Sequence, residues 1–443
     1  MVDAKALCTR WQALVNRFSD TFTRPGWIRF HQWLTGTVLC WEKHTITQIL
    51  TSIKLQDQWR NLEHFAEYGA FDRGAVEVAT IRLVEAEKPA RFAGFHPVAL
   101  DDTKEHRTSK NVWGTCTFFE PAGRSPNRAS TVRAHNWIEL GDLLPGEPWR
   151  YLPHTARLYF RKSQLPAGET FCTKTAWAVD MLRQVDANSA APILAAFDGA
   201  YANRTVIGPC INPGAGQRRI EVVTRLREDA RLFGAKEVPQ KRSRGRPRKH
   251  GPRLPPPRDH LLWNVAWRKS TAYVYGRERT IRYKKMECYW SVAGPEQKVH
   301  VFVFEVEGYS ETWYTVTTAL SLTPEETVSV FAARFRQENG FRDHKQRLGM
   351  EECRAWTKEP VLRTFGVQMV AQTLLTLMQF QLDEAHGEQG WWSPPDWNRR
   401  KEHPSLLDVR RLFWECREEF SQLLREPGEM HKILNAADAK RTG

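Results

Sequence analysis

FHPVALDDT, residues 95–103, is a short apolar run that ends in two acidic residues, and APILAAFDG, residues 191–199, repeats this pattern further along the chain. The length and apolar character of each run indicate a buried strand. In open α/β sheets, functional residues lie at the carboxyl ends of the strands. Asp101 or Asp102 from the first run and Asp198 from the second therefore mark the predicted site.

The segments around these two runs predict an α/β sheet with some antiparallel pairing. A crossover helix is predicted at 169–185, and further strands are predicted at 112–119, 136–144 and 156–160. Beyond residue 205, alternating apolar and polar residues indicate an antiparallel β-meander. Its four strands are expected at 261–267, 280–290, 300–307 and 312–317.

Both ends of the chain are predicted to be helical. In the first 90 residues, the segments 45–53, 57–68 and 73–87 are compatible with a helix-turn-helix that places a helix in a major groove. A helical bundle that only packs explains the same pattern equally well. Towards the other end, one long helix is expected from Pro324 to about Leu348. Two more helices are expected, at 361–385 and 406–424.

The positive charge is concentrated in one segment. The 443 residues carry a net charge of +14, and residues 201–290 alone contain 22 Lys and Arg against 7 Asp and Glu. The rest of the chain is therefore almost neutral. Such a local excess favours contact with a polyanion over a uniformly basic protein.

Residues 241–258, KRSRGRPRKHGPRLPPPR, lie within this basic segment and are rich in Pro and Gly, which predicts a loop. Its centre, Arg244 to Pro247, resembles an AT-hook, whose arginines enter a narrow A·T-rich minor groove. A non-specific phosphate-binding loop, with Arg248 and Lys249 as further contacts, explains the composition equally well.

Several other classes of protein are excluded by the sequence. The first residues, MVDAKALC, lack the pattern of a signal peptide, and the apolar segment 361–382 includes Arg363 and several glutamines, unlike a membrane span. The eight cysteines are scattered without a C-x-x-C pair, which favours a reducing cytoplasm over a zinc site or a disulfide framework. We therefore expect a cytoplasmic protein with no membrane partner.

The helix expected around Glu338 carries a charged and aromatic stripe. Phe331, Arg334, Glu338, Phe341 and Lys345 are three or four positions apart and share one helix face. Taken alone, a solvated row of ion pairs accounts for this pattern. Together with two acidic strand ends, however, the Glu338 carboxylate completes an oxygen ligand set suited to Mg²⁺ and to phosphodiester cleavage.

These residues resemble a known family. ARFRQENGFRDHKQRLGMEECRAWT, residues 333–357, is similar to the Y-R-E-K block of the DDE transposases that bacterial insertion sequences encode. VALDDTK (98–104) resembles the strand of the family's first aspartate, and ILAAFDGAYANR (193–204) that of its second. WYTVTTALSLTPEETV (313–328) resembles the lead-in to the glutamate helix. The likeness covers about 95–380, in the family's order.

The resemblance implies an RNase H-like catalytic core, a mixed sheet flanked by helices, that is interrupted by a β-rich insertion. It implies a metal-binding triad of Asp101, Asp198 and Glu338, with Asp102 as the alternative first ligand. The triad would hold a pair of Mg²⁺ ions, for which Mn²⁺ can substitute. The regions expected are a helical DNA-binding domain (1–90), a first core part (91–204), the basic insertion (205–322), a second core part (323–385) and a helical C-terminal region (386–443).

The resemblance also assigns DNA contacts. Arg334 and Lys345 match the family's phosphate-binding positions, and Arg342 on the same helix is a further candidate. Phe331 replaces the family's tyrosine, which removes a hydrogen bond to phosphate and retains an aromatic face. In relatives that form a DNA hairpin, a tryptophan of the insertion receives a flipped base, for which Trp313 is the first candidate here and Trp290 the second.

The predicted function is that of a cut-and-paste DNA transposase that acts in the bacterial cytoplasm on nucleoid DNA. Its DNA partners would be the terminal inverted repeats of its element and a target, and a homodimer would hold two ends in the synaptic complex. A catalytically inactive DNA-binding protein derived from such an enzyme is the alternative. A host nuclease with the same core is a third hypothesis, which the insertion and the Y-R-E-K-like helix disfavour.

Overall fold

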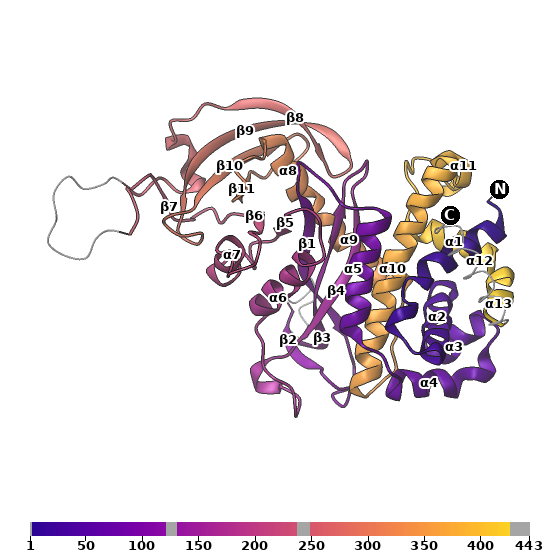
Figure 1. Ribbon diagram of the computed structural model, residues 1–443. Coiled ribbons are helices and arrows are strands. Elements are labelled where there is room, and N and C mark those ends of the chain that lie inside the picture. Colours follow the sequence, from indigo (N-terminus) through magenta and orange to yellow (C-terminus); the bar gives the residue numbers. More distant parts are fainter. Residues whose placement is uncertain (1, 121–130, 237–248, 426–443) are drawn as a thin grey trace.

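A computed structural model describes residues 2–120, 131–236 and 249–425 (Figure 1). Within this part, eleven strands join in one mixed sheet, and helices cover both of its faces. The strands are β1 (His96–His106), β2 (Cys116–Phe119), β3 (Thr131–Leu144), β4 (Arg150–Tyr159), β5 (Ile193–Phe197), β6 (Glu221–Arg225), β7 (Leu232–Phe233), β8 (Arg268–Val274), β9 (Arg277–Trp290), β10 (Lys298–Val306) and β11 (Trp313–Thr317).

The middle of the sheet is the part that brings the predicted acidic residues together. From β4 the order runs through β3, β1, β5 and β6. β1 and β5 pair in parallel, as do β5 and β6, whereas β1 and β4 each pair antiparallel to β3. The mixed sheet flanked by helices is therefore confirmed. β5 ends beside the middle of β1, which continues to His106, so the prediction that the first strand ends at Asp101 is wrong.

The strands β8 to β11 form an antiparallel meander, in which β9, β10 and β11 match the strands predicted at 280–290, 300–307 and 312–317. They continue the central sheet, because β11 pairs with β6. The strand predicted at 261–267 is wrong. The indole N–H of Trp263 donates to the Pro255 carbonyl at 3.1 Å and folds this segment back on itself, so the meander begins with β8. That residues 205–322 are an insertion stays a prediction.

The α-helices of the described residues are α1 (Ala4–Asn16), α2 (Arg24–Leu39), α3 (Ile46–Ser52), α4 (Trp59–Tyr68), α5 (Arg73–Glu87), α6 (Lys174–Asp186), α7 (Arg204–Ile211), α8 (Pro324–Ala333), α9 (Phe335–Arg347), α10 (Lys358–His386), α11 (Glu388–Trp391), α12 (Leu406–Glu415) and α13 (Arg417–Arg425). Val98 and Leu100 of β1 pack in one core with α6 and α7. Ala99, between them, packs with α8 on the opposite face. Alternate residues of β1 thus face different helices.

The long helix α10 occupies the centre of the molecule, between the sheet and the terminal helices (Figure 1). By length and composition alone it could span a membrane, but 89% of its most apolar stretch is buried inside the protein. The helices α1 to α5 share one hydrophobic core with α10, α12 and α13. The prediction of helical chain ends is therefore confirmed for the described residues.

The single helix predicted from Pro324 to Leu348 is wrong, because a turn at Arg334 divides it into α8 and α9. α8 packs on β5, β6 and β8, whereas α9 packs on β1 and β4. The two halves thus follow different parts of the twisted sheet. The turn places Arg334 at the point where they diverge.

The helix predicted at 406–424 is also divided, at Cys416. The rings of Phe413 in α12 and Phe420 in α13 stack with their centroids 5.0 Å apart. In one continuous helix these positions would be about 10 Å apart along the axis, since each residue adds 1.5 Å. The aromatic contact therefore requires the break.

A buried polar network ties α9 to the sheet. The Tyr151 hydroxyl of β4 donates to Oε1 of Glu139 in β3 at 3.0 Å and accepts from Nε2 of Gln337 in α9 at 3.0 Å. The same amide nitrogen donates to the Glu139 carbonyl at 2.9 Å. Because the three side chains are buried, each hydrogen bond also gives a partner to a polar group that would otherwise be buried without one.

A second buried network joins β1, β3 and β4. Oδ1 of Asp142 lies 2.7 Å from Nε2 of His96 and 2.9 Å from Nε2 of His154, and all three side chains are almost inaccessible. Burial by itself raises the pKa of Asp142. The charges and hydrogen bonds of His96 and His154 outweigh this effect and hold the pKa of Asp142 well below its usual range.

We expect Tyr151→Phe to lower the free energy of unfolding by about 2 kcal/mol, because it leaves a buried carboxylate oxygen and a buried amide without their shared partner. Urea unfolding followed by circular dichroism measures the loss. Hydrogen exchange should speed up in α9 in particular. The control, Tyr309→Phe, alters an exposed ring and should stay within about 0.5 kcal/mol of the parent. Equal stability of Tyr151→Phe and the parent would contradict this account.

Asp142→Asn should cost about 3 kcal/mol near neutral pH, because it breaks a buried charge network. A carboxylate whose pKa is lowered by folding stabilises the protein above its unfolded pKa and loses this effect as the pH falls. The deficit of the variant should therefore be constant down to about pH 5 and shrink below about pH 4. Asp396→Asn, at a side chain that is 95% exposed, is the control. A deficit that grows on acidification would refute this assignment.

Candidate active site

The structure separates the two adjacent aspartates of β1. The carboxylate of Asp102 accepts from Nζ of Lys174 at 2.7 Å and from the Tyr201 hydroxyl at 3.1 Å. Asp101 lies on the other face of the sheet, where it meets Arg334. Adjacent residues of a strand project to opposite faces, so only one of the two can face α9. That residue is Asp101.

Asp101 lies within β1, level with the end of β5, which Asp198 directly follows. Leu100 of β1 is paired with Phe197 of β5, so the next residue of each strand lies at the same level. The backbone N–H of Ala200 donates to Oδ1 of Asp198 at 2.8 Å and holds it at the start of the turn. Burial, and then the negative charge of Asp198, raise the pKa of Asp101 to about 7. The two carboxylates therefore share a site that is short of positive charge.

Arg334 is the cation nearest to this pair and also reaches the predicted third carboxylate. Its Nη1 lies 3.2 Å from Oδ2 of Asp101, and its Nη2 lies 3.6 Å from Oε1 of Glu338. The Arg334 side chain is 16% exposed and that of Glu338 is 45% exposed. The guanidinium thus lies between a buried carboxylate and a more exposed one.

The predicted metal triad is assembled only in part. Among the described residues, no group of three or more His, Cys, Asp or Glu side chains converges closely enough to hold a metal ion. Asp101 and Asp198 adjoin, whereas Glu338 is joined to Asp101 through Arg334. The donors present are carboxylate oxygens, which suit a hard divalent cation. The raised pKa of Asp101 indicates that Arg334 alone does not offset the charge, so this chemistry fits such an ion.

The other predicted residues of this helix face different surroundings. Nζ of Lys345 lies 3.8 Å from the Glu351 carboxylate, and burial lowers the pKa of Lys345. Arg342 is exposed. Phe331 is partly buried in the core beneath α8, with its ring centroid 6.0 Å from that of Trp313. Of these three residues only Arg342 is exposed, and the roles of all three in binding phosphate stay predictions.

Trp313 belongs to an aromatic cluster beside the carboxylates. Its ring centroid lies 5.6 Å from that of Tyr275 and 5.5 Å from that of Tyr309, and Tyr275 lies 5.4 Å from Phe335. Tyr275 and Gly276 form the two-residue turn between β8 and β9, both with positive φ, which is unusual for a tyrosine. Sequence reasoning missed Tyr275, although a Tyr-Gly pair between two alternating stretches signals such a hairpin turn.

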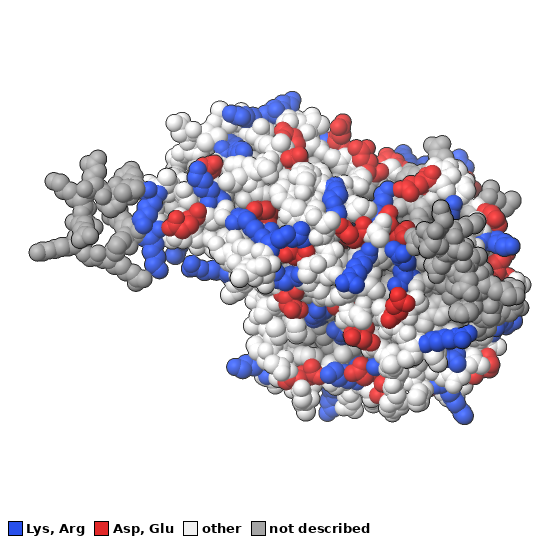
Figure 2. Space-filling model, in the orientation of Figure 1, with Lys and Arg blue, Asp and Glu red and all other residues white. Residues whose placement is uncertain are grey.

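The second candidate for a base-accepting tryptophan is contradicted. Trp290 is 4% exposed and packs in the core beside α6 and α7, so its ring has no face left for a base. The first part of the predicted DNA-binding loop, including Arg244, Arg246 and Arg248, lies outside the described residues, whereas Lys249 is described and exposed. Figure 2 shows Lys and Arg side chains gathered around β7, while basic and acidic side chains alternate over the rest of this face.

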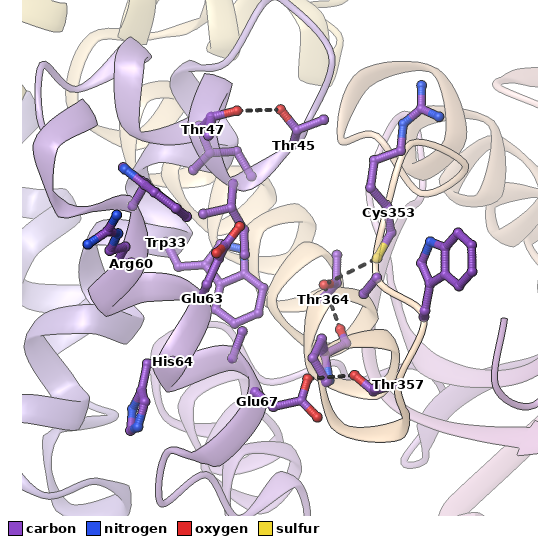
Figure 3. Close-up of a pocket in the computed structure, with 18 of the residues that line it drawn as sticks. Trp33, Thr45, Thr47, Arg60, Glu63, His64, Glu67, Cys353, Thr357 and Thr364 are labelled. Carbon is purple, nitrogen blue, oxygen red and sulfur yellow. Dashed lines mark hydrogen bonds between the residues drawn. The ribbon is translucent and has the colours of Figure 1, made fainter.

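The segment predicted as a helix-turn-helix forms one wall of a cavity of about 620 Å³ (Figure 3). α3 and α4 lie opposite the segment that leads into α10. Oγ1 of Thr357 donates to the Glu67 carboxylate of α4 at 2.5 Å, and Sγ of Cys353 lies 3.6 Å from Oγ1 of Thr364. α4 is therefore tied to α10 along one side. Its role in reading DNA stays a prediction.

Comparison with known proteins assigns the family. A family model described as DDE superfamily endonuclease matches residues 17–285, more than half of the chain. The matched segment includes Asp101 and Asp198 and ends before Glu338. A search of curated proteins finds no match. With a mixed sheet that brings two aspartates together and a family match of this length, the chain belongs to the DDE superfamily endonucleases.

Proposed function

We propose that this endonuclease is the transposase of an insertion sequence, which cuts phosphodiesters at the ends of its element and joins them to target DNA. The observation that carries the proposal is the meeting of Asp101, within β1, and Asp198, directly after β5, beside Arg334 and Glu338 at the start of α9. The order of the three motifs along the chain, and the Y-R-E-K-like spacing, support a transposase over a general nuclease.

In this proposal Asp101, Asp198 and Glu338 hold divalent metal, Mg²⁺ or in its place Mn²⁺. A pair of such ions supplies the charge that stabilises both the attacking and the leaving oxygen of a phosphodiester. The excess negative charge on Asp101 and Asp198 favours this binding. The exposed carboxylate of Glu338 has room to turn towards them once Arg334 releases it.

Arg334 acts as an exchangeable counter-charge. In the free protein its guanidinium neutralises part of the charge on Asp101 and Glu338. With divalent cations held at the carboxylates, the guanidinium would be free to donate to a DNA phosphate, for which its planar fork is suited. Lys345, further along α9, would hold a second phosphate. Phe331 lacks the hydroxyl of the family's tyrosine and serves as packing beneath Trp313.

The decisive experiment incubates the purified protein with Mg²⁺ and a duplex that contains the inverted repeats bordering its gene. We expect nicking at the repeat ends, and a loss of more than about a hundredfold in the rate for Asp101→Asn, Asp198→Asn and Glu338→Gln. The matched control is Asp102→Asn, which alters a carboxylate on the opposite face of β1 and should retain cleavage.

Each alternative has its own outcome in this assay. Binding of the repeats without any cleavage would favour the inactive DNA-binding protein. Cleavage that ignores the repeats would favour the host nuclease. Loss of activity in Asp102→Asn with full activity in Asp101→Asn would overturn the assignment of the first ligand.

The basic loop should supply a large share of the DNA affinity. Replacing Arg244, Arg246, Arg248 and Lys249 together by glutamine removes four cations. Each cation that contacts a phosphate adds about 0.9 to the slope of log affinity against log salt. We expect weaker binding and a slope smaller by about 2 to 4 in fluorescence anisotropy titrations at several salt concentrations.

The control for this variant replaces Arg282 and Lys298, whose charges are already paired with Glu305 and Glu287 at 2.7 Å each. It lowers the net charge of the same region and should leave the slope nearly unchanged. If the loop variant and the parent have the same affinity and slope, the basic segment does not hold DNA.

A further inference from the structure

A basic cavity of about 420 Å³, separate from the one beside α3 and α4, lies beside α9. The tip of the β8–β9 hairpin, α9 and the segment 401–406 enclose it, and none of the three proposed metal ligands lines it. Arg336, Arg342 and Asp343 reach it from α9. It is therefore a separate site that shares one helix with the carboxylates.

Arg336 is the unusual residue of this cavity. Its side chain is half-buried, yet it makes no hydrogen bond and no ion pair with any residue in the described part of the chain. Burial lowers the pKa of Arg336, and the nearby charge of Arg150 acts in the same direction. A guanidinium remains charged in proteins, so its burial without an acceptor is costly. An anion would remove this cost.

Of the other charged groups of the cavity, Arg342 is exposed to solvent, and the rest are engaged or partly neutralised. Lys401 is paired with Asp408, and Arg150 with Asp383 at 3.2 Å. Arg277 has a long contact with Glu402, 3.9 Å, in which both side chains are exposed. Burial raises the pKa of Asp343, so its negative charge is the less favoured form there. The unmet demand for an anion is thus centred on Arg336.

A second unpartnered group lies next to Arg336. The Tyr273 hydroxyl of β8 is buried and has no hydrogen-bond partner in the described structure. A methyl group placed on Gly276 would lie 3.3 Å from Nη2 of Arg336 and 3.9 Å from the Tyr273 hydroxyl. A guanidinium and a hydroxyl, both donors without acceptors, therefore flank the glycine of the hairpin tip. Gly276 leaves the space between them open.

We propose that this cavity binds a backbone phosphate of DNA through Arg336. The inference rests on the proposed function and extends it to a second point of contact with the strand. The position of the hairpin tip favours a phosphate of DNA over a free anion as the ligand. Tyr275, at the tip of the β8–β9 hairpin, packs on Phe335 and lies close enough to Arg334 and Glu338 for their charges to act on its hydroxyl. A DNA strand bound at the carboxylates would therefore pass this tip and reach Gly276.

The test measures binding of a fluorescein-labelled duplex from the border of the gene, in Ca²⁺, to the full-length protein. We expect Arg336→Gln to bind about tenfold more weakly and to lower the salt slope by about one. Replacing single phosphates of the duplex by neutral methylphosphonates then locates the contact. One position should weaken binding by the parent about tenfold and have no further effect on Arg336→Gln.

The control is Arg399→Gln, which removes the same charge at an exposed residue paired with Asp396. It should bind like the parent. Thermal unfolding checks that Arg336→Gln is folded. If it is not, Arg336→Lys, which keeps the charge and loses the fork, replaces it in the phosphate scan with a smaller expected loss.

Two results would overturn the inference. The first is equal affinity of Arg336→Gln and the parent. The second is a phosphate scan in which every position affects both proteins alike. If the parent binds and cleaves the duplex under either result, the proposed function stands and only the second phosphate site fails. If the parent does not bind the duplex at all, both proposals fail together.

Discussion

Repulsion between two carboxylates organises this molecule around the end of β5 and the middle of β1 beside it. Parallel pairing brings Asp101 and Asp198 to the same level, and burial makes their shared negative charge expensive. A cation is needed to offset this negative charge, and Arg334 supplies it from the turn between α8 and α9. The turn lets α8 follow one part of the sheet and α9 another, and it directs the guanidinium inwards. The interruption of the helix at Arg334 therefore also places the cation that offsets the charge of the two aspartates.

The helix α9 carries three different surfaces on one short stretch of chain. Gln337 turns inwards and joins the buried network of Tyr151 and Glu139. Glu338 faces Arg334 and the carboxylate site, and Arg336 lines the basic cavity. Neighbouring residues of a helix point about 100° apart, so three consecutive positions reach three environments. Rigid anchoring of the middle residue holds the other two in place.

Much of the fold was predictable from the sequence, because strands and helices leave periodic patterns. The first half of β1, the strand β5 that ends before Asp198, the meander from β9 to β11 and the helical chain ends follow from such patterns, whereas the continuation of β1 beyond Asp101 does not. The choice between Asp101 and Asp102 was not predictable, since it depends on which face of β1 meets α9. The break at Arg334 leaves no local signal either, because its cause is the packing of each half on a different set of strands.

The site was predictable in its residues and not in its arrangement. The three acidic residues come from motifs, but the position of Arg334 between Asp101 and Glu338 depends on contacts between segments far apart in the chain. Tyr275, Tyr273 and Arg336 belong to no motif of the family. They come close together only because the tip of the β8–β9 hairpin folds against α9, about sixty residues later in the chain. No short sequence pattern encodes such a contact.

The shared core of the chain ends has a consequence for protein engineering. α1 packs directly on α13, and both lie across α10 from the sheet (Figure 1). A fluorescent label or an affinity handle at the N-terminus would therefore sit on the side remote from the carboxylates. Because α1 and α13 pack on each other and share one core with α10, removing either helix would expose apolar surface of the other.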